Sequence, residues 1–323
     1  MTEPESTPFH EGERAIQERY GIHEQLAKRG RRMIRPYMPD QHRDFYSKLP
    51  FLIVGSTDQA GNPWASIVAG PPGFAQTPDA TRLQVSAQPL PGDPLATHLK
   101  PGASVGMLGL EPHTRRRNRL NGKIERTANG AAPGFRVQVD QTFGNCPKFI
   151  VPREAIFQPL DPETAPKISH FERLDSDAQR LISEADTFFI ASAHEAPNLH
   201  ASDTLTIDRS AYGVDVSHRG GDPGFVTLAG DGAFHYPDYR GNQHFNTLGN
   251  LVCNPKSGYL FVDFSSGRIL MLTGTSSIEW DQGGTGFPAG AERMLRFELT
   301  RGICIENALP LRWAPPKPKP TKR

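Results

Sequence analysis

One stretch in the second half of the chain carries polar side chains suited to binding an anion. Its members are Arg240, Gly241, Asn242, Asn246, Thr247 and Asn250. The three asparagines recur at i, i+4 and i+8, so they share one face of a helix predicted over 242–252. A helix N-terminus offers free backbone N–H groups and a partial positive charge, which together favour phosphate. For Asn242 alone, helix capping is the simpler interpretation.

Two basic clusters lie at predicted strand ends. His218 and Arg219 end a strand before Gly220-Gly221, as anion contacts or as ordinary surface residues. In the first half, the run 113–119 reads HTRRRNR. Side chains alternate along a strand, so Arg116 and Asn118 face one side while Arg117 faces the other. One side is expected to line a cleft, and which of the two does so stays open, as does a solvated basic hairpin.

A third candidate is the run QTFGNCPKFI, residues 141–150, in which Asn145 and Lys148 are possible ligand contacts. Cys146 belongs to the same run, and the other two cysteines, Cys253 and Cys304, are distant from it. Their number and spacing argue against a disulfide framework and a structural zinc site. We expect a reducing, cytoplasmic environment.

The composition excludes several functional classes. The formal net charge of +1 and the absence of aromatic residues among the basic ones argue against nucleic-acid binding. No apolar run approaches the ~20 residues needed to span a bilayer, so no membrane association is expected. The 31 glycines and 30 prolines indicate many turns and short strands.

The elements that must position these residues repeat. PPGF at 71–74 matches DPGF at 222–225, and the strand before each also matches. Gly73 and Gly224 are 151 residues apart, Pro101 and Pro255 are 154 apart, and Gly122 and Gly274 are 152 apart. A nearly constant offset indicates a tandem duplication.

Each repeat has the pattern of a small antiparallel barrel of about six short strands with one short helix. The fold class is therefore mainly β, with two tandem split barrels packed as a pseudo-dimer and an N-terminal helical arm. The predicted boundaries are 1–48 for the arm, 49–152 for the first barrel, 153–173 for a linker, 174–300 for the second barrel and 301–323 for a tail. Within the arm, Gly21 and Gly30 are expected to interrupt the helix.

The longest matching runs are GVDVSHRGGDPGFVTL at 213–228 and YPDYRGNQHFNTLGNLVCNPKSGYLFVDF at 236–264. Together with YMPDQHRDFYSKLPFLIVGS at 37–56 and QTFGNCPKFI, they resemble the pyridoxamine 5′-phosphate oxidase-like FMN-binding split barrels. The resemblance extends over roughly residues 9–279. It is greatest to the flavin-nucleotide-binding branch, in which one chain contains two such barrels.

The resemblance implies an FMN phosphate near the start of the second unit's helix and flavin-ring contacts from the first unit. The first unit has Asp93 at its own helix start, and a carboxylate there would repel phosphate. One FMN per chain is therefore expected. The family's Ser-Arg-Lys cluster is replaced here by Phe245-Asn246-Thr247, so oxidation of pyridoxamine phosphate itself is not expected.

These features predict an FMN-dependent oxidoreductase acting on a small-molecule substrate. No GxGxxG follows a strand, so the electron donor would be external, either a nicotinamide nucleotide or a ferredoxin-type reductase. A homodimer is possible. The alternatives are a non-catalytic flavin carrier or sensor, a pseudo-dimer without a ligand, and a haem-binding barrel. The candidate haem ligands are His98, His113, His218 and His244.

Overall fold

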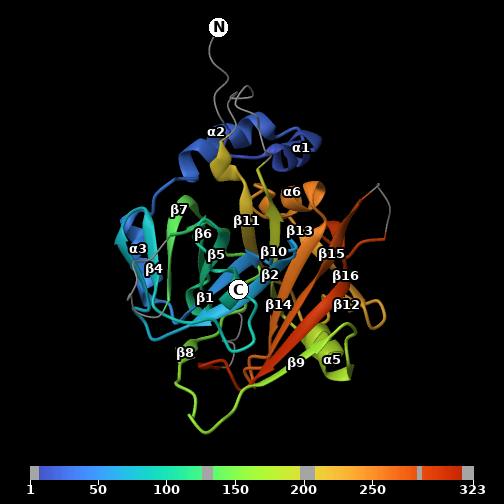
Figure 1. Cartoon of the computed structure of the whole chain (residues 1–323). Helices are drawn as coiled ribbons and strands as arrows, with labels where there is room; N and C mark the ends of the chain where they lie inside the picture. The colour runs from blue at the N-terminus through green and yellow to red at the C-terminus, as the bar shows by residue number, and fades with distance from the viewer. Residues whose placement is uncertain (1–6, 126–133, 197–207, 282–285, 315–323) are drawn as a thin grey trace, which may run out of the picture.

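The computed structural model describes residues 7–125, 134–196, 208–281 and 286–314. The chain is mainly β, as predicted, and forms two bodies placed side by side (Figure 1). Within the described ranges, no helix is both long enough and apolar enough to cross a membrane.

The first unit contains a 7-stranded antiparallel sheet in the order β2-β1-β5-β6-β7-β4-β3. Its strands are β1 Phe51–Thr57, β2 Pro63–Ala69, β3 Ala75–Asp79, β4 Arg82–Val85, β5 Ser104–Glu111, β6 Arg116–Ile124 and β7 Phe135–Gly144. The helix α4, Leu95–His98, precedes β5, and the 3-10 turn η1, Pro112–Thr114, precedes β6.

The second unit repeats that order as β11-β10-β14-β15-β16-β13-β12. Its strands are β10 Thr187–His194, β11 Gly213–Gly220, β12 Thr227–Leu228, β13 Ala233–Tyr239, β14 Lys256–Val262, β15 Ile269–Trp280 and β16 Ala291–Glu306. Its helices are α5 Ser176–Glu184, the 3-10 turn η2 Arg209–Ala211, and α6 Asn246–Cys253. The two sheets therefore share one strand order, as expected for the duplication that the sequence offsets predict.

The two units pack through equivalent strands. A Cβ on Gly106 of β5 would lie 2.7 Å from the carbonyl oxygen of Val214 and 2.9 Å from the Cα of Asp215, both in β11. A Cβ on Gly258 of β14 would lie 2.3 Å from the carbonyl oxygen of Pro63 and 2.7 Å from the Cα of Trp64, both in β2. The two glycines therefore make matching close approaches across a pseudo-two-fold axis.

The strand β1 shows why the sequence run FLIV is continuously apolar. Leu52 and Val54 belong to the core of the first barrel, whereas Phe51 and Ile53 belong to a separate core between the two units. Phe189 and Ala191 of β10 contribute to the same shared core. Strands that are buried on both faces lose the apolar–polar alternation of a half-exposed strand.

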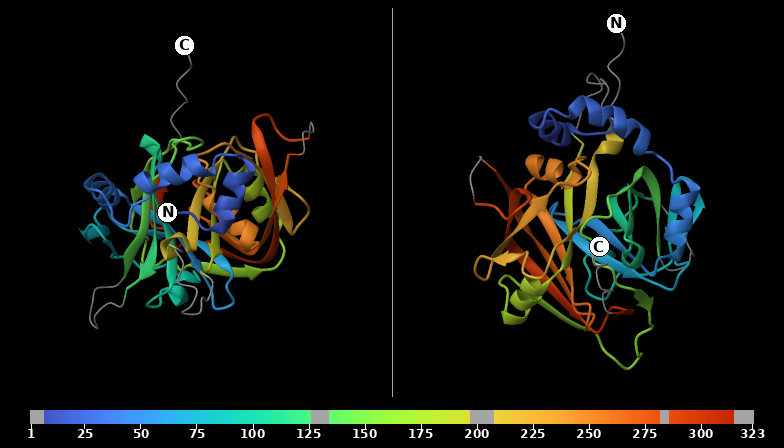
Figure 2. Two further views of the ribbon diagram at one scale, coloured as in Figure 1. Left: turned by 90° about the horizontal axis from the view of Figure 1, so that it is seen from above. Right: turned by 180° about the vertical axis from the view of Figure 1, so that it is seen from behind.

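The N-terminal arm consists of α1 Glu11–Arg19, α2 His23–Met33 and α3 Asp40–Lys48. The first two helices lie across one end of the molecule, next to α6 (Figures 1 and 2). Gly21 separates them with a φ of 66°, as expected. Gly30 does not interrupt α2. A Cβ there would lie 2.8 Å from the ring of Phe9, so this glycine permits close packing of the arm.

The regions predicted as linker and tail contain strands. β9, Lys167–Phe171, pairs with β16, and β8, Ala155–Phe157, pairs with β17, Leu311–Trp313. β16 itself runs to Glu306, so residues 301–314 belong to the folded body rather than to a tail. β9 reads KISHF and four of its five residues are exposed, so it lacks the regular apolar–polar alternation by which a half-buried strand is recognised.

Candidate functional site

A cavity lined by four arginines lies where the two units meet. The strand β6 of the first unit forms one wall, and β11, β16 and the loop from β13 into α6 form the others. Its polar lining comprises Arg117, Arg119, Asn145, Ser217, His218, Arg219, Asp238, Tyr239, Asn242, Gln243, Asn246, Thr247 and Arg293. The site is thus composed of both halves of the duplication.

Two of its arginines are deeply buried and incompletely hydrogen-bonded. Arg119 lies 2.5 Å from a carboxylate oxygen of Asp215 and donates to the hydroxyl of Ser217, yet its Nε has no hydrogen-bond partner. Arg293 donates to the carboxylate of Glu292 and lies 3.5 Å from Asp238, while its Nε and Nη1 make no hydrogen bond. Buried donors normally find acceptors, so an anion is the kind of ligand that these groups can accommodate.

The other two arginines face the same space. Arg117 donates from Nε to the carbonyl oxygen of Cys146 at 2.7 Å, and Arg219 lies 3.4 Å from Asp238. Burial, together with the nearby charges of Arg219 and Arg119, lowers the pKa of Arg117 to about 10. A bound anion would reduce the electrostatic repulsion between these cations.

The histidine of this cavity is neutral. Burial and the surrounding arginines, Arg117 first among them, lower the pKa of His218 well below its ordinary value. Its Nδ1 lies 3.0 Å from Nη1 of Arg117 and, facing an obligate donor, accepts that hydrogen bond. His218 therefore orients Arg117 and adds no charge of its own.

Backbone geometry places the start of α6 at the cavity. Gln243 and Phe245 both have a φ of 64°, an uncommon left-handed conformation for residues other than glycine. Phe245 is the N-cap and supplies no side-chain cap. The first N–H groups of α6 thus lack a capping side chain where the helix dipole favours an anion.

Asn242 and Asn250 correct the predicted helix face. α6 begins at Asn246, so Asn242 lies in the preceding loop, where its amide donates to Asn145 at 3.2 Å. Asn250 is buried and donates to Ser192, away from the cavity. Of the three asparagines, only Asn242 and Asn246 line the site.

One face of the strand β6 is turned to the cavity. Arg117 and Arg119 line the cavity, whereas Arg116 is exposed, with its guanidinium 5.0 Å from the ring of Phe45. Asn118 is buried outside the lining. The predicted opposition of neighbouring side chains is therefore present, with the odd-numbered residues inside.

The predicted residues divide into two groups. Those that line the cavity are Arg117, Asn145, His218, Arg219, Gly241, Asn242, Asn246 and Thr247. Those outside its lining are Arg116, Asn118, Lys148, Arg240 and Asn250. Sequence reasoning left Arg119 and Arg293 out of the site. Arg119 belongs to the recognised basic run, but Arg293 lies in a strand with no motif around it.

The arm reaches the same place. Glu13 of α1 is 2% exposed, and it accepts hydrogen bonds from the side chain of Asn246 and from the backbone N–H of His10 at 2.9 Å. Burial raises the pKa of Glu13 well above its ordinary range. Asn246 also accepts from Arg119 at 2.9 Å, so the arm, α6 and β6 share one hydrogen-bond network.

The first unit has its own carboxylate at the equivalent helix. Asp93 is buried, and its Oδ1 accepts from the N–H of Leu95 and from the hydroxyl of Ser66, both at 2.8 Å. In the second unit, Ser217 and Thr247 form the matching contact at 2.9 Å. The side chain of Asp93 thus occupies the N–H of Leu95 at the start of α4.

The histidines proposed as haem ligands have other environments. His98 is buried and lies 2.9 Å from the hydroxyl of Ser56. His113 is partly exposed near Glu111. His244 is buried and packs against the rings of Phe9 and Phe143, with centroids 5.4 Å away in each case.

Comparisons with known proteins give likenesses of fold only. No family model matches the chain, and no curated protein matches it. HupZ of Group A Streptococcus is 15% identical over 41% of this chain and 98% of its own, with a TM-score of 0.28. A putative pyridoxamine 5′-phosphate oxidase of Lactobacillus delbrueckii is 12% identical over 41% of this chain and 98% of its own, with a TM-score of 0.26.

A third solved structure, from Clostridium acetobutylicum, is described as related to general stress protein 26 of B. subtilis in the pyridoxinephosphate oxidase family. It is 15% identical over 40% of this chain and 86% of its own, with a TM-score of 0.26. Each of these chains therefore aligns with less than half of the present one.

Proposed function

We propose that the chain binds one FMN at the cavity between its two units and that it is a flavin-dependent oxidoreductase. The observation that carries the proposal is the convergence of Arg117, Arg119, Arg219 and Arg293 on the uncapped start of α6. Such a donor set fits a phosphate dianion, which arginine recognises through paired hydrogen bonds.

The residues divide the work of binding. Arg117 and Arg219, which make fewer internal contacts, would bind the phosphate together with the N–H groups at the start of α6. Arg119 is paired with Asp215, and Arg293 with Glu292 and with Asp238, which it shares with Arg219; these two buried arginines would supply positive field behind the phosphate. The four guanidinium groups have three carboxylate partners, Asp215, Asp238 and Glu292, and the remaining positive charge favours an anion over a neutral ligand.

Bound flavin would supply the electron chemistry, while the chain provides orientation and excludes water. The resemblance described above is what points to a flavin rather than to another phosphate ester. An electron donor, either a nicotinamide nucleotide or a separate reductase, and a small-molecule acceptor complete the proposal.

Titration with FMN and with riboflavin tests it, because the two differ only in the phosphate. We expect quenching of FMN fluorescence at a stoichiometry of one and an affinity at least about tenfold higher than for riboflavin. Equal affinities would contradict the phosphate site, and the absence of binding by either flavin would contradict the proposal as a whole.

A further inference from the structure

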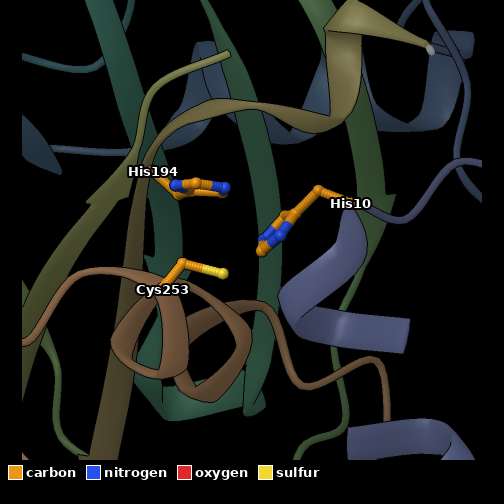
Figure 3. Close-up of side chains that lie close together, drawn as sticks. All are labelled: His10, His194 and Cys253. Atoms are coloured by element: carbon orange, nitrogen blue, oxygen red, sulfur yellow. The ribbon is translucent and has the colours of Figure 1, made fainter. Parts of the chain in front are cut away.

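A second cluster of ligand-type side chains lies behind α6, away from the arginine cavity. His10 at the N-cap of α1, His194 at the end of β10 and Cys253 at the end of α6 point toward one another (Figure 3). Their ligand atoms all lie within 4.8 Å of one another. Three separate elements therefore bring imidazole and thiol groups to one point.

We propose that His10, His194 and Cys253 bind a zinc ion. Two imidazoles and a thiolate form a borderline-soft donor set, which suits zinc and not magnesium or calcium. A tetrahedral zinc site places its ligand atoms about 3.3–3.8 Å apart, as follows from zinc–ligand distances of about 2.0–2.3 Å. The three ligand atoms lie within 4.8 Å of one another, so rotation of the side chains would have to bring them closer by up to about 1 Å.

The surroundings of His194 support coordination by its Nδ1. Its Nε2 lies 2.6 Å from a carboxylate oxygen of Glu11, whose other oxygen accepts from the hydroxyl of Tyr212 at 2.7 Å. A carboxylate that accepts from one ring nitrogen leaves the lone pair of the other free for a metal. Glu11 thus orients His194 as outer-shell carboxylates do in metalloproteins.

The ring of His10 is buried and has a different hydrogen-bond environment. It is 3% exposed, its Nε2 has no hydrogen-bond partner, and the nearest carboxylate is that of Glu13 at 3.7 Å. Its Nδ1 accepts from the N–H of Gly12 at 3.1 Å, so the neutral ring carries its proton on Nε2. Zinc binding would therefore use the Nδ1 lone pair that now accepts the N–H of Gly12.

Cys253 can replace Nδ1 of His10 as the acceptor of the Gly12 N–H, which would free the Nδ1 lone pair. Its Sγ would lie 2.6 Å from a Cβ on Gly12, so the sulfur sits directly beside the donor that His10 now uses. On zinc binding, the thiol of Cys253 loses its proton to solvent and the sulfur–zinc bond forms. The resulting thiolate can accept the N–H of Gly12, and the fourth zinc position remains for water.

Such a site would cross-link the N-terminal arm to the second barrel through metal coordination. α1 packs on α6 so closely that a Cβ on Gly12 would lie 2.2 Å from the carbonyl oxygen of Gly249. Zinc at the end of α6 would join the same two helices by bonds to both. The arm would then be ordered by metal, independently of any ligand in the arginine cavity.

The test uses the full chain after treatment with a chelator and removal of any flavin. Titration with zinc against a chromophoric competitor is expected to give one site per chain. His10→Asn keeps a capping side chain, while His194→Asn and Cys253→Ser remove one ligand each. Each should weaken zinc binding by at least about tenfold, whereas His170→Asn, an exposed histidine elsewhere, should not.

Cobalt(II) provides a second measurement that does not depend on stability. The wild type and His170→Asn should show a thiolate-to-cobalt charge-transfer band, and Cys253→Ser should lack it. Zinc should also raise the unfolding temperature of the wild type, but not that of the three ligand variants. Absence of zinc binding by the wild type, or equal binding by all variants, overturns the site. FMN titration of the same samples reports on the flavin proposal separately.

Discussion

At the scale of residues, the site depends on which side of a strand a charge faces. Arg116 and Arg117 are adjacent, yet only Arg117 lines the cavity, where it contacts His218 and the carbonyl oxygen of Cys146. The alternation itself follows from the sequence, because a strand has a period of two. Which side is inner depends on packing against the second unit, which no local pattern records.

The neighbouring arginines therefore form a matched pair of variants. We expect Arg117→Ala to weaken FMN binding by about tenfold or more, because a charge-assisted contact is lost. Arg116→Ala should change it by less than about twofold, since that side chain lies over Phe45 on the outer face. Fluorescence titration measures both, and equal losses would show that the strand is oriented differently.

Asp93 predicts a pH dependence of stability. Burial raises its pKa to about 7 from the ordinary 3.8. The folded state keeps this proton while the unfolded state loses it, so stability falls as the pH rises from about 4 to about 7. The full effect is on the order of 4 kcal/mol.

Asp93→Asn removes the charge and keeps an acceptor for Leu95 and Ser66. Urea unfolding should show the variant to be more stable than the wild type at about pH 8 and similar to it at about pH 4. A constant difference between the two proteins across this range would mean that Asp93 is not the titrating group.

At the scale of elements, α6 links the arm to the cavity. Its first turn lines the arginine site, while Gly249 in its middle contacts α1 so closely that a Cβ would lie 2.5 Å from Cγ of Glu13. The sequence indicates a helix here but places its start four residues early, because Asn242 is a good capping residue. In the structure Asn242 bonds instead to Asn145 of the other unit.

Gly249→Ala tests this contact between helices. The added methyl group should displace the arm and lower the free energy of unfolding by about 1–3 kcal/mol, although alanine is the better helix former. Limited proteolysis should then cleave near α1 earlier than in the wild type. Gly232→Ala is the control, since no atom lies within 4 Å of its added Cβ. A fully stable Gly249→Ala would mean that α1 does not pack on α6 as described.

At the scale of the whole molecule, the duplication determines where a ligand can bind. Both sheets follow the same strand order, and the repeat was visible in the sequence from three nearly constant offsets. The two units differ near their helix starts, where Ser66 donates to Asp93 in the first unit and Thr247 donates to Ser217 in the second. Arg293 and the strand β9 were not foreseen, because each is defined by a tertiary pairing rather than by a local pattern.

The shared core predicts that the two units unfold together. Gly106→Ala and Gly258→Ala, which alter equivalent contacts between the units, should each lower stability by about 1–3 kcal/mol within one cooperative transition. Calorimetry that resolved two transitions, or a large effect at only one glycine, would contradict the pseudo-symmetric interface.

The proposal that the cavity between the units binds FMN is tested by the visible absorption spectrum of the purified protein. We expect the two broad bands of an oxidised flavin and the release of FMN on denaturation. A Soret band would instead indicate that the protein binds haem, with one of its histidines as the candidate iron ligand. A colourless protein that also fails to bind added FMN would contradict the claim while leaving the fold intact.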